Sequence, residues 1–136
     1  MGCDMSAAER ERIRSLISNH DTIKRTIENL PNGVRTTTTT SKPELVETLR
    51  THVREMAARL KANKPVRLWD PAYKAVFDHA SEITVKVEDT RDGIAVTETT
   101  SNPKTVPVIQ AHAQRVNQFV SEGLAAVAPP WAGCRR

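Results

Sequence analysis

The stretch "NGVRTTTTTSKP" (Asn32–Pro43) decides the fold, because it recurs sixty residues later as "DGIAVTETTSNP" (Asp92–Pro103). The match continues without a gap and pairs Asn32–Leu60 with Asp92–Val120, where eight of the 29 residue pairs are identical. The identical residues include the glycine of the turn, a proline and a histidine, so the match does not depend on threonine alone. We interpret the chain as an internal duplication.

Each copy is predicted to contain a β-hairpin. In residues 83–88 apolar and polar side chains alternate, which is the period of a half-buried strand. The dipeptides Asn32-Gly33 and Asp92-Gly93 tolerate positive φ and are typical of a tight type I′ turn. Return strands are therefore expected at residues 34–40 and 94–100. The threonine run is predicted to be a strand and not a low-complexity spacer, because β-branched side chains suit a pleated surface.

Each hairpin is predicted to lie between two helices. The first helix runs from Ser6 to about Asn19, and Ser41 with Glu44 forms a capping box for the helix after the hairpin. In the second copy Asp70 caps the leading helix, and the helix after the hairpin begins near Thr105. The two later helices carry apolar stripes: Leu45, Leu49, Val53, Met56 and Leu60 in one, and Ile109, Ala113, Val116 and Val120 in the other.

The expected fold is therefore α+β. An internally duplicated αββα unit contributes four antiparallel strands to one sheet, with the helices packed on one face and an approximate twofold axis between the copies. The first repeat spans residues 6–64 and the second spans 65–123, and together they form one domain. Residues 124–136, which contain two consecutive prolines, are expected to be a loosely ordered tail.

The composition is that of a globular domain, with 38% hydrophobic and 26% charged residues among 136. The net charge is +4, but basic and acidic residues alternate along the predicted helices, which disfavours nucleic acid as a partner. No apolar run reaches the roughly 20 residues of a membrane span, and no signal peptide is recognisable. Cys3 and Cys134 would pair only in an oxidising compartment, so both the paired and the free state stay open.

The four histidines are the main functional clue. His52 and His112 occupy equivalent positions beside the two apolar stripes, and His20 and His79 close the two leading helices. One interpretation is structural. A histidine near a helix C-terminus interacts favourably with the helix dipole, and a histidine on an apolar face packs with one ring nitrogen hydrogen-bonded.

The other interpretation is a metal or cofactor site. A twofold axis would bring His52 and His112 together, where two neutral imidazoles would ligate copper, zinc or the two faces of a haem iron. Met56, one turn after His52, adds a soft sulfur to this site, and His20 and His79 are further candidate metal ligands. The residue equivalent to Met56 is a valine, so the site would be asymmetric.

The motifs of several enzyme classes are missing from the chain. It contains no G-x-S-x-G, no phosphate-binding glycine loop and no C-x-x-C. Glu28 and Glu88 lie at matching strand positions, where a solvent-facing charge is the default. We therefore predict no catalytic residue, and enzymatic activity is disfavoured.

The strings "RLWDP", "DGIAVTETTSNP" and "VIQAHAQRVNQFV" resemble segments of small bacterial proteins that carry the same duplicated helix–hairpin–helix unit. The resemblance covers Ile13 to about Gly123 and brings no established activity with it. Because such proteins occur in secreted or envelope contexts, sometimes near cytochromes, the resemblance implies a periplasmic or envelope location over a cytoplasmic one. It also implies that the histidines bind a metal or take part in redox chemistry.

Three functions follow as hypotheses. The first is a non-enzymatic module that binds a copper-like metal or haem through the paired histidines. The second is a structural or protein-interaction domain, as a homodimer or with another protein, in which the histidines only pack. Its contact surface would be a flat polar sheet face formed by Thr37, Thr39, Thr97 and Thr99. The third is weak nucleic-acid binding driven by net charge.

Overall fold

Four antiparallel strands form one sheet in the order β1-β2-β4-β3, so the two return strands pair with each other at its centre. This computed structural model describes residues 5–127. The strands are β1 (Ile23–Leu30), β2 (Gly33–Thr40), β3 (Thr84–Thr90) and β4 (Gly93–Thr99). The α-helices are α1 (Ala7–Ser18), α2 (Val46–Ala62), α3 (Pro71–Asp78), α4 (Val106–Glu122) and α5 (Leu124–Val127), and short 3₁₀ turns lie at η1 (His20–Thr22), η2 (Pro43–Leu45) and η3 (Ala80–Glu82).

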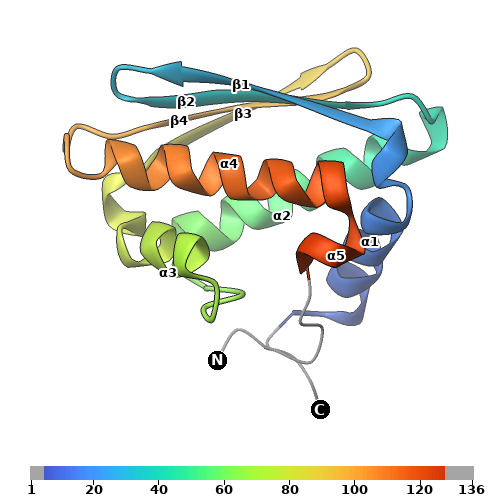
Figure 1. The fold of residues 1–136 in the computed structure, drawn as a ribbon, viewed down its shortest axis with the longest axis horizontal. Helices are drawn as coiled ribbons and strands as arrows, with labels where there is room; N and C mark the ends of the chain where they lie inside the picture. The colour runs from blue at the N-terminus through green and yellow to red at the C-terminus, as the bar shows by residue number, and fades with distance from the viewer. Residues whose placement is uncertain (1–4, 128–136) are drawn as a thin grey trace.

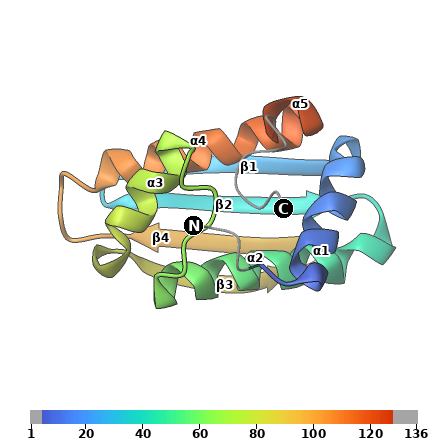
Figure 2. The ribbon, with the colours of Figure 1, turned by 90° about the horizontal axis from the view of Figure 1, so that it is seen from below.

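All the α-helices lie on one face of the sheet, here called the inner face (Figure 1). The long helices α2 and α4 run along this face, α2 against β4 and β3 and α4 against β2 and β1 (Figure 2). The short helix α1 packs on α2, and α3 packs on α4. The predicted α+β class, the four-stranded antiparallel sheet and the helices on one face are thereby confirmed, and the threonine run forms β2.

Side-chain alternation divides the threonine run between the two faces. Thr36, Thr38 and Thr40 are buried on the inner face beneath the helices. Thr37 and Thr39 point to the opposite, outer face, which no described helix covers (Figure 1). The β2–β4 register places Thr97 and Thr99 on the same outer face, so the four threonines predicted to share a surface do so.

The hairpin turns differ from the predicted type. The central turn residues are Pro31-Asn32 and Arg91-Asp92, and the glycines open the return strands. Within residues 5–127 positive φ occurs at Asn63, Arg67 and Gly123, so the type I′ assignment was wrong. A Cβ on Gly33 would lie 1.9 Å from the Glu98 carbonyl oxygen, and a Cβ on Gly93 would lie 1.9 Å from that of Thr38. Glycine is therefore required by the close approach of β2 and β4.

Three of the four predicted helix starts, those at Ser6, Asp70 and Thr105, are confirmed. Ser6 and Glu9 form a capping box at the start of α1, and Asp70 accepts the Ala72 N–H (3.1 Å) at the start of α3. The predicted capping box at Ser41 is wrong. The chain forms the 3₁₀ turn η2 first, and Thr40 Oγ1 accepts the N–H of the residue after Ser41 at 3.2 Å. Helix α2 therefore begins four residues later than a Ser41 cap would place it.

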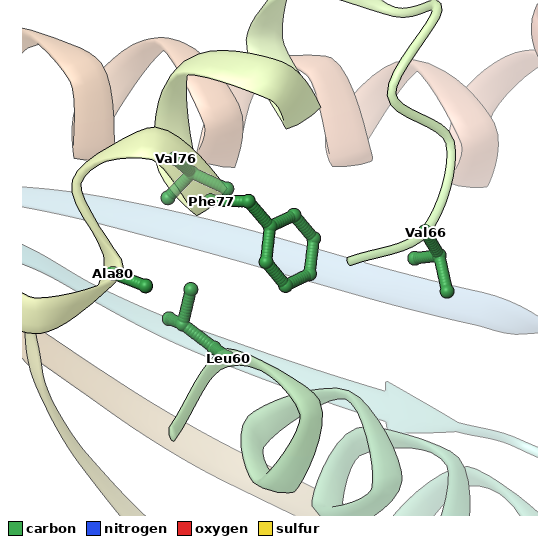
Figure 3. Packing of buried hydrophobic residues seen from close by; sticks show 5 residues of the cluster. All are labelled: Leu60, Val66, Val76, Phe77 and Ala80. Atoms are coloured by element: carbon green, nitrogen blue, oxygen red, sulfur yellow. The ribbon is translucent and has the colours of Figure 1, made fainter. Parts of the chain in front are cut away.

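The core consists of three apolar clusters along the inner face. Figure 3 shows the cluster around Phe77, whose ring lies between the ends of α2 and α3 and the segment that connects them. The members of this cluster are Leu60, Val66, Val76, Phe77 and Ala80. The second cluster contains Leu16, Ile23, Leu49 and Ile94, and the third contains Val34, Ile109 and Ala113. Both predicted apolar stripes contribute to these clusters.

Part of the chain lies outside the described residues. The expected tail begins with α5, and residues 128–136 are not described, so the predicted loose order of that segment, Cys3 and Cys134 all fall outside the description. None of the helices within residues 5–127 combines the length and the apolar composition that crossing a bilayer requires.

Candidate functional site

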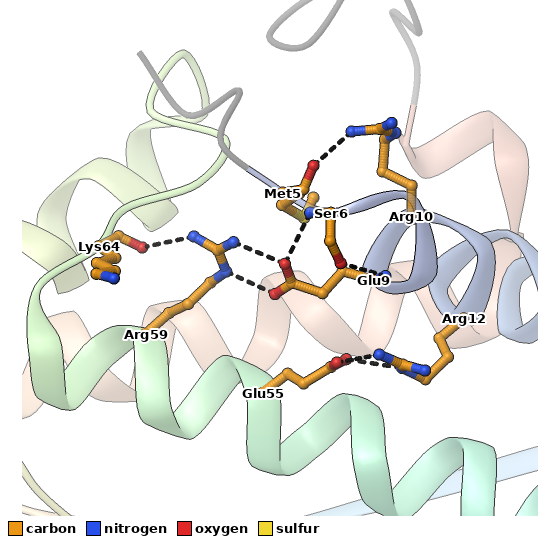
Figure 4. Close-up of polar contacts among 8 residues, drawn as sticks. All are labelled: Met5, Ser6, Glu9, Arg10, Arg12, Glu55, Arg59 and Lys64. Carbon is orange, nitrogen blue, oxygen red and sulfur yellow. Dashed lines mark hydrogen bonds and ion pairs between the residues drawn. The ribbon is translucent and has the colours of Figure 1, made fainter.

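His52 lies on α2 near the interface with α1. Two ion pairs hold this interface (Figure 4): Arg12 with Glu55, and Arg59 with Glu9, whose Nε–Oε2 and Nη2–Oε1 distances are both 2.9 Å. Burial lowers the pKa of His52 to about 4, so the imidazole is neutral at pH 7. Its Nδ1 is buried and has no hydrogen-bond partner among the described residues.

His112, the equivalent residue on α4, packs against a different helix. Its ring meets the Tyr73 ring of α3 edge-on, with centroids 4.7 Å apart and planes at 75°. Burial and, to a smaller extent, the positive charge of Arg25 lower the pKa of His112 to about 4. His112 is therefore also neutral at pH 7.

The remaining candidate ligands are already engaged. His20 Nδ1 donates to the Val120 carbonyl oxygen at 2.8 Å, which ties η1 to the end of α4. His79 Nδ1 lies 3.3 Å from a Glu82 carboxylate oxygen and 3.4 Å from Thr105 Oγ1. Met56 packs against the apolar cluster around Phe77.

The four histidines therefore occupy four different settings. The charged groups that act on His52 belong to α1 and α2, whereas those that act on His112 are Arg25 and Asp70, so the two histidines share none of them. Within residues 5–127 no three His, Cys, Asp or Glu side chains are grouped as a metal site would require. Metal or haem binding by His52 and His112 stays a prediction.

A second group of side chains converges beneath α4, and the sequence patterns did not single it out. Arg25 of β1 points to the inner face, and its Nη1 donates to Ala113 O (2.7 Å) and Asn117 Oδ1 (3.0 Å) of α4. The charge of Arg25 acts on an acid of β4, on the tyrosine of α3 and on the histidine of α4. We call this group the Tyr73 cluster; its members are Arg25, Tyr73, Glu98, His112 and Phe119.

Glu98 is the most unusual member of the cluster. The strand register places it on the inner face between Val34 of β2 and Val85 of β3, both uncharged. Burial raises the pKa of Glu98 to about 7, although Arg25 opposes the rise. Arg25 itself stays cationic, because burial lowers its pKa only to about 10. At neutral pH the cluster therefore contains one cation and one acid whose pKa burial raises.

The polar groups of the cluster have free hydrogen-bonding capacity. In the part of the chain that the structure describes, no hydrogen bond reaches the Glu98 carboxylate, the Tyr73 hydroxyl or the ring nitrogens of His112. The buried side-chain atoms without a partner in residues 5–127 are His52 Nδ1 and Thr90 Oγ1, so the cluster atoms are not sealed from solvent. Glu98 and its neighbour Val96 are only half-buried, although both lie on the helix-covered face.

Cationic and aromatic groups continue the cluster toward the surface. The Arg67 guanidinium lies 4.1 Å from the Trp69 ring centroid, 4.8 Å from that of Phe119 and 5.6 Å from that of Tyr73. Trp69 is 38% exposed. Arg67 has a φ of 59°, a left-handed conformation that costs energy in a residue with a Cβ.

Asp70 connects Arg67 to α4. It pairs with Arg67 (Nε–Oδ2 3.0 Å) and with Arg115 (Nε–Oδ2 2.8 Å). Burial alone would raise the pKa of Asp70, but the hydrogen bonds from the two arginines bring it below its ordinary value. One ionised carboxylate thus faces two arginines.

One signal in the sequence would have found part of this cluster. Ile94, Val96 and Glu98 are spaced by two residues on β4, so a strand that buries Ile94 must turn Glu98 to the same face. Arg25 follows the same rule between Ile23 and Ile27. A charged residue at an inward strand position is therefore the informative pattern.

Comparison of the chain with models of protein families, with curated proteins and with solved structures found no match.

Proposed function

We propose that this protein is a non-enzymatic binding module whose ligand site is the Tyr73 cluster. The observation that carries the proposal is that the charge of the buried Arg25 acts on Tyr73, Glu98 and His112, whose polar groups have no hydrogen bond among the described residues. Because these polar atoms are not sealed from solvent, their hydrogen-bonding capacity is open to a ligand. A ligand that enters beside Tyr73 would supply the missing partners.

The chemistry of the cluster fits binding better than catalysis. Arg25 gives a fixed cation, Tyr73 and Phe119 give aromatic surface, His112 gives a neutral imidazole, and Glu98 gives an acid with a raised pKa. A few convergent polar groups beside aromatic side chains are typical of ligand sites. The cluster contains no serine or cysteine nucleophile. Burial also raises the pKa of Tyr73 to about 12, so its hydroxyl stays protonated and is a poor nucleophile at pH 7.

The test is a screen of small acids, amines, amides and sugars by thermal shift, followed by calorimetry of the hits. Binding should weaken in Tyr73→Phe and Glu98→Gln and stay unchanged in Glu88→Gln, whose side chain is 70% exposed on the outer face. The proposal fails if the screen yields no ligand, or if every ligand binds the cluster variants as well as the parent protein. Cu(II), Zn(II) and haemin in the same screen, with His52→Ala/His112→Ala, test the metal prediction separately.

A second candidate function is a protein-interaction domain that uses the outer face of the sheet. It is favoured by the lack of a covering helix in the described chain and by the shared surface of Thr37, Thr39, Thr97 and Thr99 (Figure 1). Self-association measured by sedimentation velocity, and its loss in Thr37→Lys/Thr97→Lys, would support this function. A monomer at high concentration would remove the homodimer.

We also propose that the domain is an internal duplication with approximate twofold symmetry. The proposal is supported by the starts of α2 and α4, by those of η1 and η3 and by those of β2 and β4, each pair sixty residues apart. The central register also pairs Thr36 with Val96, which are sixty residues apart. A permuted chain in which 65–123 precedes 6–64 through a short linker should therefore fold cooperatively; an unfolded product would count against the duplication.

A further inference from the structure

We propose that the outer face of the sheet binds a second copy of this chain about a twofold axis parallel to the strands, with Glu28 of each copy opposite Lys86 of the other. This inference rests on the second candidate function, because it names the partner of the same surface and the contacts between the two copies. It is carried by the side chains that the strand register places on the outer face, by their charge and by their size.

The strand register arranges the outer face in rows that cross all four strands. One row consists of Glu28 on β1, Arg35 on β2, Thr97 on β4 and Lys86 on β3. A negative and a positive side chain thus lie at the two ends of this row, on the edge strands of the sheet. A rotation of 180° about an axis parallel to the strands sets β1 of one copy opposite β3 of the other, and each row faces the same row of the second copy. The two ends of the row therefore meet a side chain of opposite charge.

Both charged groups are available for these contacts. Glu28 and Lys86 are exposed, and neither has an ion pair within residues 5–127. Sheets that pack face to face lie about 10 Å apart, a gap that a lysine and a glutamate side chain span together. Arg35 is directed along its own sheet, because its Nη1 lies 3.1 Å from Thr97 Oγ1 and 3.4 Å from a Glu88 carboxylate oxygen. The pairs between the copies are therefore those of Glu28 with Lys86.

The centre of the outer face consists of small side chains. The register sets Thr37 beside Ala95 and Thr39 beside Gly93 on the two central strands. The same rotation places each of these threonines opposite the smaller residue of the other copy. Threonine is stiff at χ1, so its burial costs little conformational entropy. No described helix covers this face, so a second sheet can approach it (Figure 1).

The size of the face predicts a weak dimer. Four strands of seven or eight residues, about 4.8 Å apart and with about 3.4 Å per residue, give roughly 500 Å² per copy and about 1,000 Å² in total. This area is at the lower limit for a specific interface. Exposed charge pairs add specificity more than affinity, and salt screens them. The dimer should therefore be reversible and should dissociate as the salt concentration rises.

The experiment is sedimentation velocity over a wide range of protein concentration, at low and at high salt. Glu28→Lys and Lys86→Glu each set like charges opposite one another, so each should raise the dissociation constant of the dimer about tenfold or more. The double variant Glu28→Lys/Lys86→Glu and an equimolar mixture of the two single variants restore opposite charges, so both should dimerise like the parent protein. Glu88→Lys is the matched control, because it makes the same charge change in another row and should not be rescued by Lys86→Glu. Equal melting temperatures would show that all variants are folded.

The inference is overturned if the parent protein stays monomeric at low salt, or if the double variant and the mixture stay monomeric where the parent protein dimerises. If the dimer is lost in Thr37→Lys/Thr97→Lys but is unaffected by the charge reversals, this pairing falls and the outer face stands as the interaction surface. If neither set of variants affects the dimer, both fall. Arg25 and Glu98 of the Tyr73 cluster lie on the inner face, so ligand binding there should be the same in all these variants.

Discussion

Glu98→Gln should stabilise the protein, and the gain should grow with pH. In the folded chain burial raises the pKa of Glu98 to about 7, above the ordinary value of 4.5 that applies after unfolding. Between these two values the folded state binds more protons than the unfolded state, so stability falls as pH rises. Glutamine has nearly the shape of the protonated acid and cannot ionise, so the variant escapes this loss.

The magnitude follows from the distance between the two pKa values. At about 1.4 kcal/mol per pH unit, ionisation of Glu98 costs at most about 3 kcal/mol above pH 7. Water that reaches the half-buried carboxylate reduces this, so about 1–3 kcal/mol is expected at pH 8 and close to zero below pH 4.5. His52 and His112 also titrate in this range, but they are present in both proteins and cancel in the difference.

The assay is urea denaturation followed by circular dichroism at pH 5, 6, 7 and 8, with Glu88→Gln as the matched control. The control removes an exposed carboxylate 3.4 Å from Arg35, so its effect should be a few tenths of a kcal/mol at every pH. A difference between Glu98→Gln and the parent protein that stays constant from pH 5 to pH 8 would refute the buried-acid interpretation. A loss of stability at pH 8 would refute it as well.

Three further predictions concern the frame of the domain. Gly93→Ala places a Cβ 1.9 Å from the Thr38 carbonyl oxygen, so it should cost more than about 3 kcal/mol and lower the melting temperature sharply or prevent folding; an unchanged melting temperature would contradict the β2–β4 contact. His52 has a folded pKa of about 4, below its ordinary 6.5, so it costs stability as pH falls from 6.5 to 4. Between pH 7 and pH 4 the free energy of unfolding of His52→Gln should fall by up to about 3 kcal/mol less than that of the parent protein, as measured by urea denaturation. An equal fall in both proteins would contradict the burial of His52. Glu9 has its pKa lowered to about 2 by Arg59, so the pair contributes stability above pH 4.5 that is lost as pH falls through 2; Glu9→Gln should cost about 3 kcal/mol at pH 7 and almost nothing at pH 2.

The sheet and its helices were predictable because their signals are local. Alternation in residues 83–88 and the β-branched run of residues 36–40 need no knowledge of distant residues. The turn type was mispredicted for the opposite reason. Gly33 and Gly93 were interpreted as turn residues, but their glycine requirement comes from the neighbouring central strand, which a short-range motif does not contain.

The candidate site was harder to predict than the fold. His52 and His112 stood out because the repeat aligns them, yet alignment does not give the groups that surround each ring. Arg25, Tyr73 and His112 come from three elements and come together only when α3 packs on α4 and α4 packs on the sheet. In the sequence, Glu98 is only a charged residue that interrupts the apolar positions of one strand face. This interruption is informative once the buried face of the strand is known.

The strand order has a consequence for the nascent chain. β2 is an interior strand of the finished sheet, but its second partner, β4, lies more than fifty residues further along the chain. After the first hairpin has left the ribosome, the backbone N–H and C=O groups along one side of β2 therefore stay unpaired until residues 93–99 emerge. Unpaired strand edges are templates for association with other chains. The interval between the two hairpins is thus when an interior strand of this sheet has an open edge, and fragments that end before β4 should aggregate where the full chain does not.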